Sequence, residues 1–232
     1  MDSVLDKIKD FEKTAKNIAI SYGGDGTLLE TFHKNLDKAI IPIRNYGQCD
    51  KHKHLLDDIL NGTKRCKCDL KLKQCDILEC QGEHAISEIQ IVSANPTQCL
   101  RFNVYVNGEK FMDNVIANGV IASTILGSTG YFKSVTRTIF RDGFGLAFIC
   151  PTYGINNIVL KQTDWINIEF VRDAKATISW DNITKQLDIE KGNIETIRLA
   201  ADNAALFGYD IFMCKECRKG RNSTIVNDQY CI

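Results

Sequence analysis

The sequence predicts two domains, a small α/β domain at the N-terminus followed by an all-β domain. Two observations carry this prediction: short apolar runs alternate with helical patterns up to residue 62, and apolar and polar residues alternate from residue 63 onward. The composition is globular, with 44% hydrophobic and 25% charged residues in a chain of 232. We therefore expect domains at residues 1–62 and 63–212 and a C-terminal tail at 213–232.

The first 62 residues alternate between helices and buried strands. Val4, Ile8 and Phe11 recur at helical spacing, and Asn61-Gly62 is a helix stop. In chain order, the predicted elements are a helix at 3–16, a strand at 17–22, a helix at 27–36, a strand at 39–43 and a helix at 51–60. The strand–glycine turn–helix–strand order favours a parallel sheet, so we predict a small, truncated Rossmann-like α/β domain.

From residue 63 the pattern predicts a β-sandwich. Turn dipeptides at Gln81-Gly82, Asn95-Pro96 and Asn107-Gly108 separate alternating segments, and the last of these is a strong hairpin signal. The predicted strands are 64–80, 84–94, 99–106, 109–116, 144–150, 156–161, 166–171, 176–180, 184–189 and 194–200. Only the stretch after residue 128 offers another helix.

Charge and hydropathy argue against two classes of partner. Lys plus Arg equals Asp plus Glu at 29 each, whereas nucleic-acid-binding proteins usually carry a basic excess. No apolar run approaches the roughly 20 residues of a membrane span. The N-terminus is charged and lacks the apolar core of a signal peptide. We expect a soluble, cytoplasmic protein that binds neither nucleic acid nor a membrane.

The ten cysteines predict buried thiols rather than disulfides, because no export signal accompanies them. Cys66 and Cys68 alternate with charged residues, which is typical of a half-buried strand. Cys214 and Cys217 have the spacing of zinc ligands, but no second pair follows them. We expect no bound metal here, and a zinc-stabilised interaction module stays as an alternative.

The sharpest motif is GGDGT at residues 23–27, between a predicted strand and a predicted helix. Glycines let backbone N–H groups approach a phosphate closely, and the positive end of the helix dipole points to the same place. Asp25 among those donors can accept a proton from a hydroxyl or help to position a metal. The alternative is a plain glycine turn.

A second motif, GSTGY at residues 127–131, follows a predicted strand. It brings small residues, two hydroxyls and an aromatic ring to one turn. Such a turn suits contact with a ribose, a phosphate or a base, and Tyr131 can stack on a base or donate a hydrogen bond. An ordinary polar turn is the alternative for this motif taken alone.

In this order and separation, the two motifs resemble those of the NAD kinase family. GGDGT is shared with the wider diacylglycerol and sphingosine kinase superfamily, whereas GSTGY is similar to the GSTAY of NAD kinases. Ser87-Glu88 matches the family's Asn-Glu pair, and Asp181-Asn182 matches its late Asp-containing turn. The resemblance covers residues 17–200, identifies a short, divergent member and implies a nucleotide site between the two domains.

The resemblance also implies roles for individual residues. Asp25 corresponds to the catalytic Asp, Glu88 to the residue that binds a ribose of NAD, and Asp181 to a residue near the nicotinamide end or a subunit contact. The other residues placed at the nucleotide are Gly23, Gly24, Gly26, Thr27, Ser87, Asn118, Ser128, Thr129, Gly130, Tyr131 and Ser134.

Several positions depart from the family pattern. Ser87 replaces an Asn, and Asn118 replaces the Asp that opens the run before GSTAY. Thr136-Arg137 replaces a Gly-Gly pair. The phosphate-handling motif is therefore better retained than the nicotinamide pocket.

The activity that the resemblance implies is that of a kinase, a transferase that phosphorylates the adenosine ribose 2′-hydroxyl of NAD to give NADP. ATP or polyphosphate would be the donor, Asp25 the general base, and Mg²⁺ would accompany ATP. Family members are dimers or tetramers, so we expect a homodimer or homotetramer. The alternatives are a non-catalytic NAD(P)-binding sensor and a lipid kinase of the same superfamily.

Overall fold

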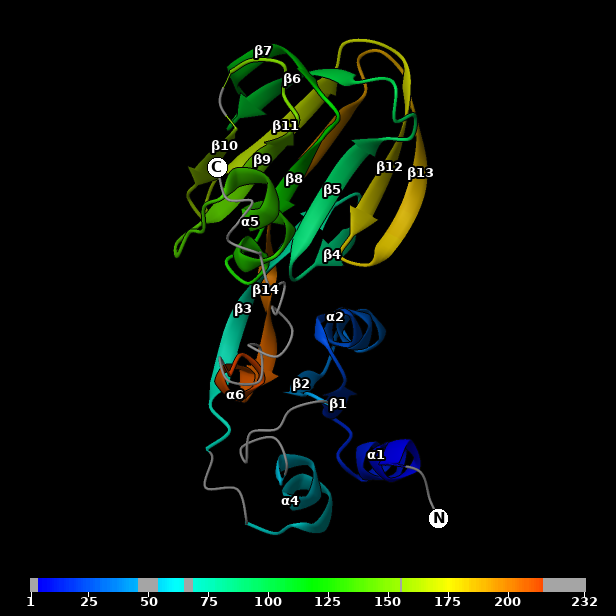
Figure 1. The fold of residues 1–232 in the computed structure, drawn as a ribbon, viewed down its shortest axis with the longest axis vertical. Helices are drawn as coiled ribbons and strands as arrows, with labels where there is room; N and C mark the ends of the chain where they lie inside the picture. Colours follow the sequence, from blue (N-terminus) through cyan, green and yellow to red (C-terminus); the bar gives the residue numbers. More distant parts are fainter. Residues whose placement is uncertain (1–3, 46–53, 65–68, 155, 215–232) are drawn as a thin grey trace, which may run out of the picture. The chain divides into compact units, whose positions relative to one another are not determined.

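The computed structural model describes residues 4–45, 54–64, 69–154 and 156–214, which form two compact units (Figure 1). Unit 1 comprises Met1–Lys73 and Ala205–Ile232, and unit 2 comprises Gln74–Ala204. The expected fold class, an α/β part and a β-sandwich part, is confirmed. The division differs from the boundaries expected at residues 62 and 212, because the chain returns to unit 1 after residue 204.

Unit 1 is built on the parallel strand pair that the sequence predicts. Its elements are α1 (Val4–Thr14), β1 (Ile18–Tyr22), α2 (Asp25–Lys34), β2 (Ala39–Ile43), α4 (Leu55–Asn61) and α6 (Tyr209–Phe212). β1 and β2 pair in parallel from Ile18↔Ala39 to Tyr22↔Ile43. On the other side of β2, Ile40 pairs with Leu206 at the end of β14, again in parallel.

The paired strands β1 and β2 bury one face of their sheet against α1 and α4. Ile20 and Ile41 pack with Ile8 of α1 and Leu55 of α4 in one apolar cluster. α2 lies on the other side of the pair (Figure 1) and buries Leu28 and Phe32. The predicted helix stop is observed, because α4 ends at Gly62 in the left-handed conformation with φ of 64°.

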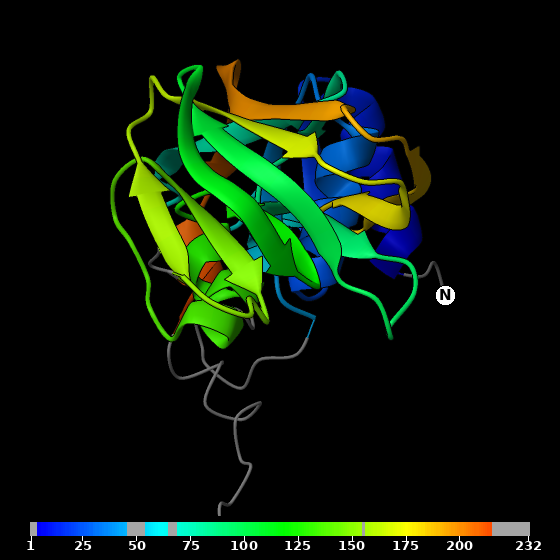
Figure 2. The same ribbon diagram turned by 90° about the horizontal axis from the view of Figure 1, so that it is seen from above.

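Unit 2 is a sandwich of two antiparallel sheets. One sheet orders its strands β14–β11–β6–β7, with β3 and β4 joined to it through β14, and the other orders them β10–β9–β8–β5–β12–β13. The second sheet is seen nearly face-on in Figure 2, as neighbouring green and yellow strands. The elements are β3 (Leu72–Cys80), β4 (Glu83–Ala85), β5 (Glu88–Ser93), β6 (Leu100–Val106), β7 (Glu109–Ala117), β8 (Gly119–Ser123), η1 (Gly127–Thr129), α5 (Tyr131–Thr136), β9 (Phe144–Ile149), β10 (Asn157–Leu160), β11 (Trp165–Phe170), β12 (Ala174–Trp180), β13 (Ile183–Ile189) and β14 (Ile194–Phe207).

The core of unit 2 lies between the two sheets. Phe102 and Ile168 from one sheet and Ile91 and Phe148 from the other are fully buried in a single cluster. α5 covers the outer face of the second sheet, where its Phe132 packs with Ile121 of β8, Ala147 of β9 and the ring of Phe140. The helix predicted after residue 128 therefore has an apolar reason to form there.

Some predicted bounds change in the structure. The strand expected at 84–94 is two strands, β4 and β5, because the backbone between them bonds to a side chain rather than to a neighbouring strand. The run 64–80 is a strand only from Leu72 onward, and Cys66 and Cys68 lie outside the described residues. β14 continues to Phe207 instead of ending at 200. Among the described residues, no helix is long and apolar enough to cross a membrane.

Candidate active site

The first group of expected site residues surrounds the start of α2 in unit 1. The backbone N–H of Gly23 donates to the Ile43 carbonyl at 2.8 Å, which places the motif at the carboxyl end of the parallel pair. α2 begins at Asp25, two residues earlier than predicted, and Gly24 caps it without a side-chain hydrogen bond. The helix therefore presents its N-terminal N–H groups and the positive end of its dipole at this edge.

The glycines of this motif have different reasons to be glycine. A Cβ at position 23 would overlap the Oγ1 of Thr27, whose side chain folds over the turn. A Cβ at position 26 would meet no atom of the described residues within 4 Å, so these residues leave space beside the first helical turn. Gly23 and Thr27 thus shape the loop, whereas Gly26 leaves room for a ligand.

Asp25 lies in this open region and forms an ion pair that the sequence analysis missed. Its carboxylate Oδ1 is 2.8 Å from Nη2 of Arg44, and the side chains are 51% and 0% exposed, respectively. Arg44 follows β2 directly, while Asp25 follows β1. Because parallel strands end at the same edge of a sheet, a charged residue right after the neighbouring strand was the available signal.

The second group lies in unit 2, at the start of β5. Ser87 is buried and its Oγ donates to Oε2 of Glu88 at 2.5 Å. Burial raises the pKa of the Glu88 carboxyl, as does the nearby charge of Asp181, while the bond from Ser87 acts in the opposite direction. Glu88 is therefore a partly buried carboxyl that holds its proton more readily than an exposed one.

Asp181 holds this segment in place through three backbone hydrogen bonds. It lies in the turn between β12 and β13 with φ of 54° and is buried. Its Oδ2 accepts from the N–H of Ile86 at 2.9 Å, and its Oδ1 from those of Ser87 at 2.8 Å and Glu88 at 3.0 Å. The resemblance placed Asp181 toward the nicotinamide or a subunit contact, whereas here its carboxylate binds the chain's own backbone.

The GSTGY turn packs against the same segment. A Cβ at Gly127 would overlap the Ser87 carbonyl oxygen, so this close approach requires glycine. A Cβ at Gly130 would lie 3.9 Å from Oε2 of Glu88. Thr124, which the sequence analysis did not single out, fastens the turn, since its Oγ1 donates to the Ile86 carbonyl at 2.6 Å. A threonine just before the glycine turn was the only signal for it.

The hydroxyls of this turn divide into internal and exposed ones. Ser128 is buried and donates to the Ile125 carbonyl at 2.8 Å. Ser134 is exposed, although it donates to the Tyr131 carbonyl at 2.7 Å. Thr129 and Tyr131 are also exposed, the latter at 38%. Of the expected contact residues here, Thr129, Tyr131 and Ser134 therefore present their side chains to solvent, where a ligand could reach them.

Asn118 is not brought to this group. It precedes β8, and its side-chain Oδ1 lies 3.3 Å from Sγ of Cys99. Glu88 pairs with Ser123 at the opposite end of β8. At about 3.4 Å per strand residue, five residues separate the two positions by about 17 Å. The structure thus places Ser87, Glu88, Asp181 and the GSTGY turn together and leaves Asn118 apart.

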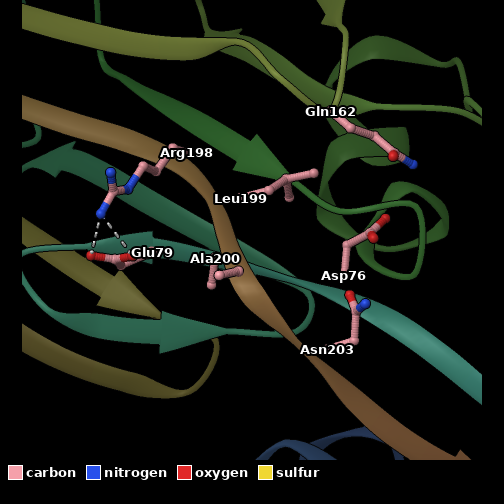
Figure 3. A pocket seen from close by; sticks show the side chains of 8 residues that line it. Asp76, Glu79, Gln162, Arg198, Leu199, Ala200 and Asn203 are labelled. Atoms are coloured by element: carbon pink, nitrogen blue, oxygen red, sulfur yellow. Dashed lines mark hydrogen bonds and ion pairs between the residues drawn. The ribbon is translucent and has the colours of Figure 1, made fainter.

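An open pocket of about 450 Å³ lies elsewhere in unit 2 (Figure 3). Arg198 on β14 pairs with both carboxylate oxygens of Glu79 on β3 at 3.3 Å, at one end of the pocket. The lining residues are Asp76, Glu79, Gln162, Arg198, Leu199, Ala200, Ala201 and Asn203. It contains no expected site residue, and its ion pair is exposed enough to contribute little to stability.

The described residues contain no group of three or more His, Cys, Asp or Glu side chains that could hold a metal. Burial raises the pKa of the Cys80 thiol to about 12, and Oε2 of Glu195, 3.7 Å away, adds to this. Cys80 is therefore a neutral buried thiol in the metal-free protein. Cys214 is described, but Cys217, the other cysteine of the pair with zinc-ligand spacing, lies outside the described residues.

Comparison with known proteins gives consistent results. A family model described as the ATP-NAD kinase C-terminal domain matches residues 86–207. The bifunctional NADP phosphatase/NAD kinase of Methanocaldococcus jannaschii is 32% identical over 215 residues, which cover 85% of this chain but only 37% of that protein. The NAD kinase of Latilactobacillus sakei is 27% identical over 192 residues, covering 72% of this chain and 70% of the relative.

Two solved structures share the fold. The yeast NADH kinase complexed with NADH superposes with a TM-score of 0.70 at 18% identity, covering 90% of this chain and 67% of that one. The NAD kinase from Archaeoglobus fulgidus in complex with ATP gives a TM-score of 0.66 at 19% identity, covering 96% and 94% of the two chains. The likeness extends through both units.

Proposed function

This chain belongs to the NAD kinase family, and from this premise we propose that it phosphorylates the adenosine ribose 2′-hydroxyl of NAD to give NADP. We propose ATP as the phosphoryl donor, because a solved structure with the same fold is a complex with ATP. The relatives matched by sequence are named NAD kinases, so a lipid substrate is not favoured.

One observation carries the proposal: the exposed carboxylate of Asp25 at the N-terminus of α2, in a loop of glycines with open space beside Gly26. The N-terminus of a helix attracts anions, and the glycine loop lets phosphates approach the backbone. A carboxylate beside a phosphate site is placed to receive a proton from an attacking hydroxyl.

The proposed step is an in-line phosphoryl transfer. The 2′-oxygen forms a bond to the γ-phosphorus of ATP, the bond from that phosphorus to the bridging oxygen breaks, and ADP leaves. The proton of the 2′-hydroxyl goes to the Asp25 carboxylate. The remaining contribution of the protein is positioning and electrostatic stabilisation of the transferring group.

Glu88 is the proposed ribose anchor. Its carboxyl has Ser87 on one side and Gly130 close to Oε2, and a carboxylate can accept from two ribose hydroxyls. The exposed ring of Tyr131, next to Gly130, would stack on a base or on the nicotinamide.

Mg²⁺ is proposed to accompany ATP and to neutralise charge on the donor phosphates. Such an ion is held largely by phosphates and water, so the proposal requires no group of several protein carboxylates. Asp25 supplies a solvent-exposed carboxylate oxygen, the kind of donor that Mg²⁺ prefers.

The direct test is to incubate the pure protein with NAD and Mg-ATP and to measure NADP with an NADP-specific dehydrogenase. The Asp25→Asn variant should lower kcat by about 10²–10⁴-fold, the usual contribution of a positioned base. Asp37→Asn, an exposed carboxylate beyond the other end of α2, is the matched control and should be fully active. A second arm with polyphosphate in place of ATP tests the choice of donor.

Two results would contradict the proposal. Binding of NAD without any NADP formation from either donor would make the chain a dinucleotide sensor. Unchanged turnover in Asp25→Asn would remove Asp25 from the reaction and return GGDGT to a plain turn.

A further inference from the structure

We infer that Arg44 is the positioning residue for Asp25: its buried guanidinium fixes the carboxylate in the orientation from which it meets the ribose hydroxyl. The inference rests on the proposed function and adds a residue to it. It lies entirely within unit 1 and uses only described residues.

Arg44 is held rigidly by contacts on two sides. Its Nε donates to the Phe212 carbonyl at 2.8 Å, and the guanidinium lies 3.9 Å from the centroid of the Phe212 ring. The side chain is completely removed from solvent. Because an arginine is always charged and its planar fork has a fixed geometry, these contacts leave the remaining N–H groups pointing in set directions.

Burying this cation is costly unless it is paired, so the ion pair with Asp25 is not an incidental surface contact. Nη2 reaches Oδ1 of Asp25 at 2.8 Å from the protein side, while half of the Asp25 side chain faces solvent. The pair therefore has one immobile partner and one partner that faces the open region. This arrangement is the one expected when a fixed side chain holds a reacting carboxylate in one orientation.

The residues next to Asp25 explain why its orientation depends on Arg44. Glycines flank Asp25 on both sides, so the two residues next to it carry no side chain that could pack against its carboxylate. Arg44 contacts this carboxylate from outside the loop. A displacement of the base by about 1 Å lowers the rate by about 10²-fold, so a fixed hydrogen-bond partner has a direct kinetic effect.

The support comes from a distant part of the chain. Phe212 belongs to α6 and is 168 residues away from Arg44 in sequence. The match to the C-terminal family domain covers residues 86–207, so Asp25 and Phe212, which contact the arginine, lie outside it. The pairing is thus a property of unit 1, which α6 completes.

The test is a double-mutant cycle on turnover with Arg44→Met, a variant that keeps an unbranched apolar side chain against the Phe212 ring. In otherwise wild-type protein, Arg44→Met should lower kcat by about 10–100-fold and change the KM values of NAD and ATP by less than about threefold, because orientation and not binding is lost. In the Asp25→Asn background the same substitution should have almost no further effect, since there is no base left to orient.

Two further variants keep the test decisive if Arg44→Met folds poorly. Arg44→Lys keeps the positive charge but loses the planar guanidinium with its fixed N–H directions. Compared with Arg44→Met, it should recover only part of the lost kcat. Phe212→Leu removes the ring beneath the guanidinium without touching Asp25 and should lower kcat by about two- to tenfold in the same direction. Urea unfolding of each variant shows whether it is folded under assay conditions.

The outcomes separate this inference from the proposed function. Equal fold-losses for Arg44→Met in the wild-type and Asp25→Asn backgrounds would mean that Arg44 only supports the fold, and the inference would be overturned while NAD kinase activity stands. A wild-type kcat in Arg44→Met would overturn it as well. No NADP formation by the wild-type protein would instead reject the proposed function itself.

Discussion

At the scale of single residues, Glu88, which we propose as the ribose anchor, lowers the stability of the free protein near neutral pH. Its carboxyl is partly buried between Ser87 and Gly130, and burial, followed by the charge of Asp181, raises its pKa. A carboxyl with a raised pKa in the folded state stabilises the fold when protonated. That stabilisation is complete below the unfolded-state pKa and is lost as the pH rises through the folded-state pKa.

We therefore predict opposite effects of Glu88→Gln on stability and on binding. The glutamine is neutral at every pH, so the variant should unfold at a higher temperature than the wild type at pH 7. This difference should vanish below about pH 4, near the ordinary pKa of a glutamate. NAD should bind about 30-fold more weakly, because a hydrogen bond to a charged group contributes about 2 kcal/mol. Thermal unfolding across pH and calorimetric titration with NAD measure the two effects.

Asn118→Asp is the matched control for the binding measurement. Asn118 lies at the opposite end of β8 from the Glu88 pairing position, so an added charge there should leave NAD affinity unchanged. If Asn118→Asp tightened NAD as much as Glu88→Gln weakens it, the grouping of residues in unit 2 would not describe the bound state.

At the scale of elements, the turn between β12 and β13 holds the start of β5 in place through hydrogen bonds. The Asp181 carboxylate replaces a neighbouring strand as the acceptor for three consecutive N–H groups. This is why the strand predicted at 84–94 breaks into β4 and β5, with Ile86 and Ser87 between the two strands. A site residue is thus oriented by a turn 93 residues away.

Asp181→Asn should destabilise the protein by about 2–3 kcal/mol, because one amide oxygen cannot replace two charged acceptors and the amide NH₂ faces backbone donors. Urea denaturation measures the change. Asp188→Asn on β13 is the control, since its ion pair with Lys175 spans 3.8 Å between exposed side chains and should contribute less than about 0.5 kcal/mol. Equal losses in both variants would show that Asp181 is an ordinary surface charge.

Features set by local chemistry could be predicted from the sequence. The stop at Gly62 and the hairpin at Asn107-Gly108 depend on residues within a few positions of one another, and the parallel pair of β1 and β2 on one strand–turn–helix–strand stretch of 26 residues. The contact from Arg44 to Phe212 and the hydrogen bonds to Asp181 join residues far apart in the chain. Motifs located Asp25, Glu88 and Asp181, but no periodicity or motif encodes which groups they contact. The ion pair of Asp25 with Arg44 and the hydrogen bonds of Asp181 to the start of β5 were therefore not predicted.

At the scale of the whole molecule, each unit has its own apolar core. Ile41 belongs to the cluster of unit 1 and Ile91 to that of unit 2. Both tryptophans, Trp165 and Trp180, lie in unit 2, whereas the longer helices α1 and α2 lie in unit 1. Tryptophan fluorescence and helical circular dichroism therefore report on different units.

Ile41→Ala should separate the unfolding of the two units. The cavity should cost unit 1 about 2–5 kcal/mol and lower the urea midpoint seen by circular dichroism at 222 nm, while the fluorescence midpoint stays near that of the wild type. Ile91→Ala should move the fluorescence midpoint instead. Identical shifts of both signals in both variants would show that the protein unfolds as a single cooperative body.

The return of the chain to unit 1 after residue 204 also sets an order of events during synthesis. A ribosome adds about 5–20 residues per second, so the segment that ends with Phe212 emerges on the order of ten seconds after the first 73 residues. The continuous stretch 74–204 is itself synthesised during that interval, and its last residue is added only eight residues before Phe212. Asp25 and Arg44 are therefore translated early, yet the ring that holds the arginine is among the last parts of the described fold to arrive.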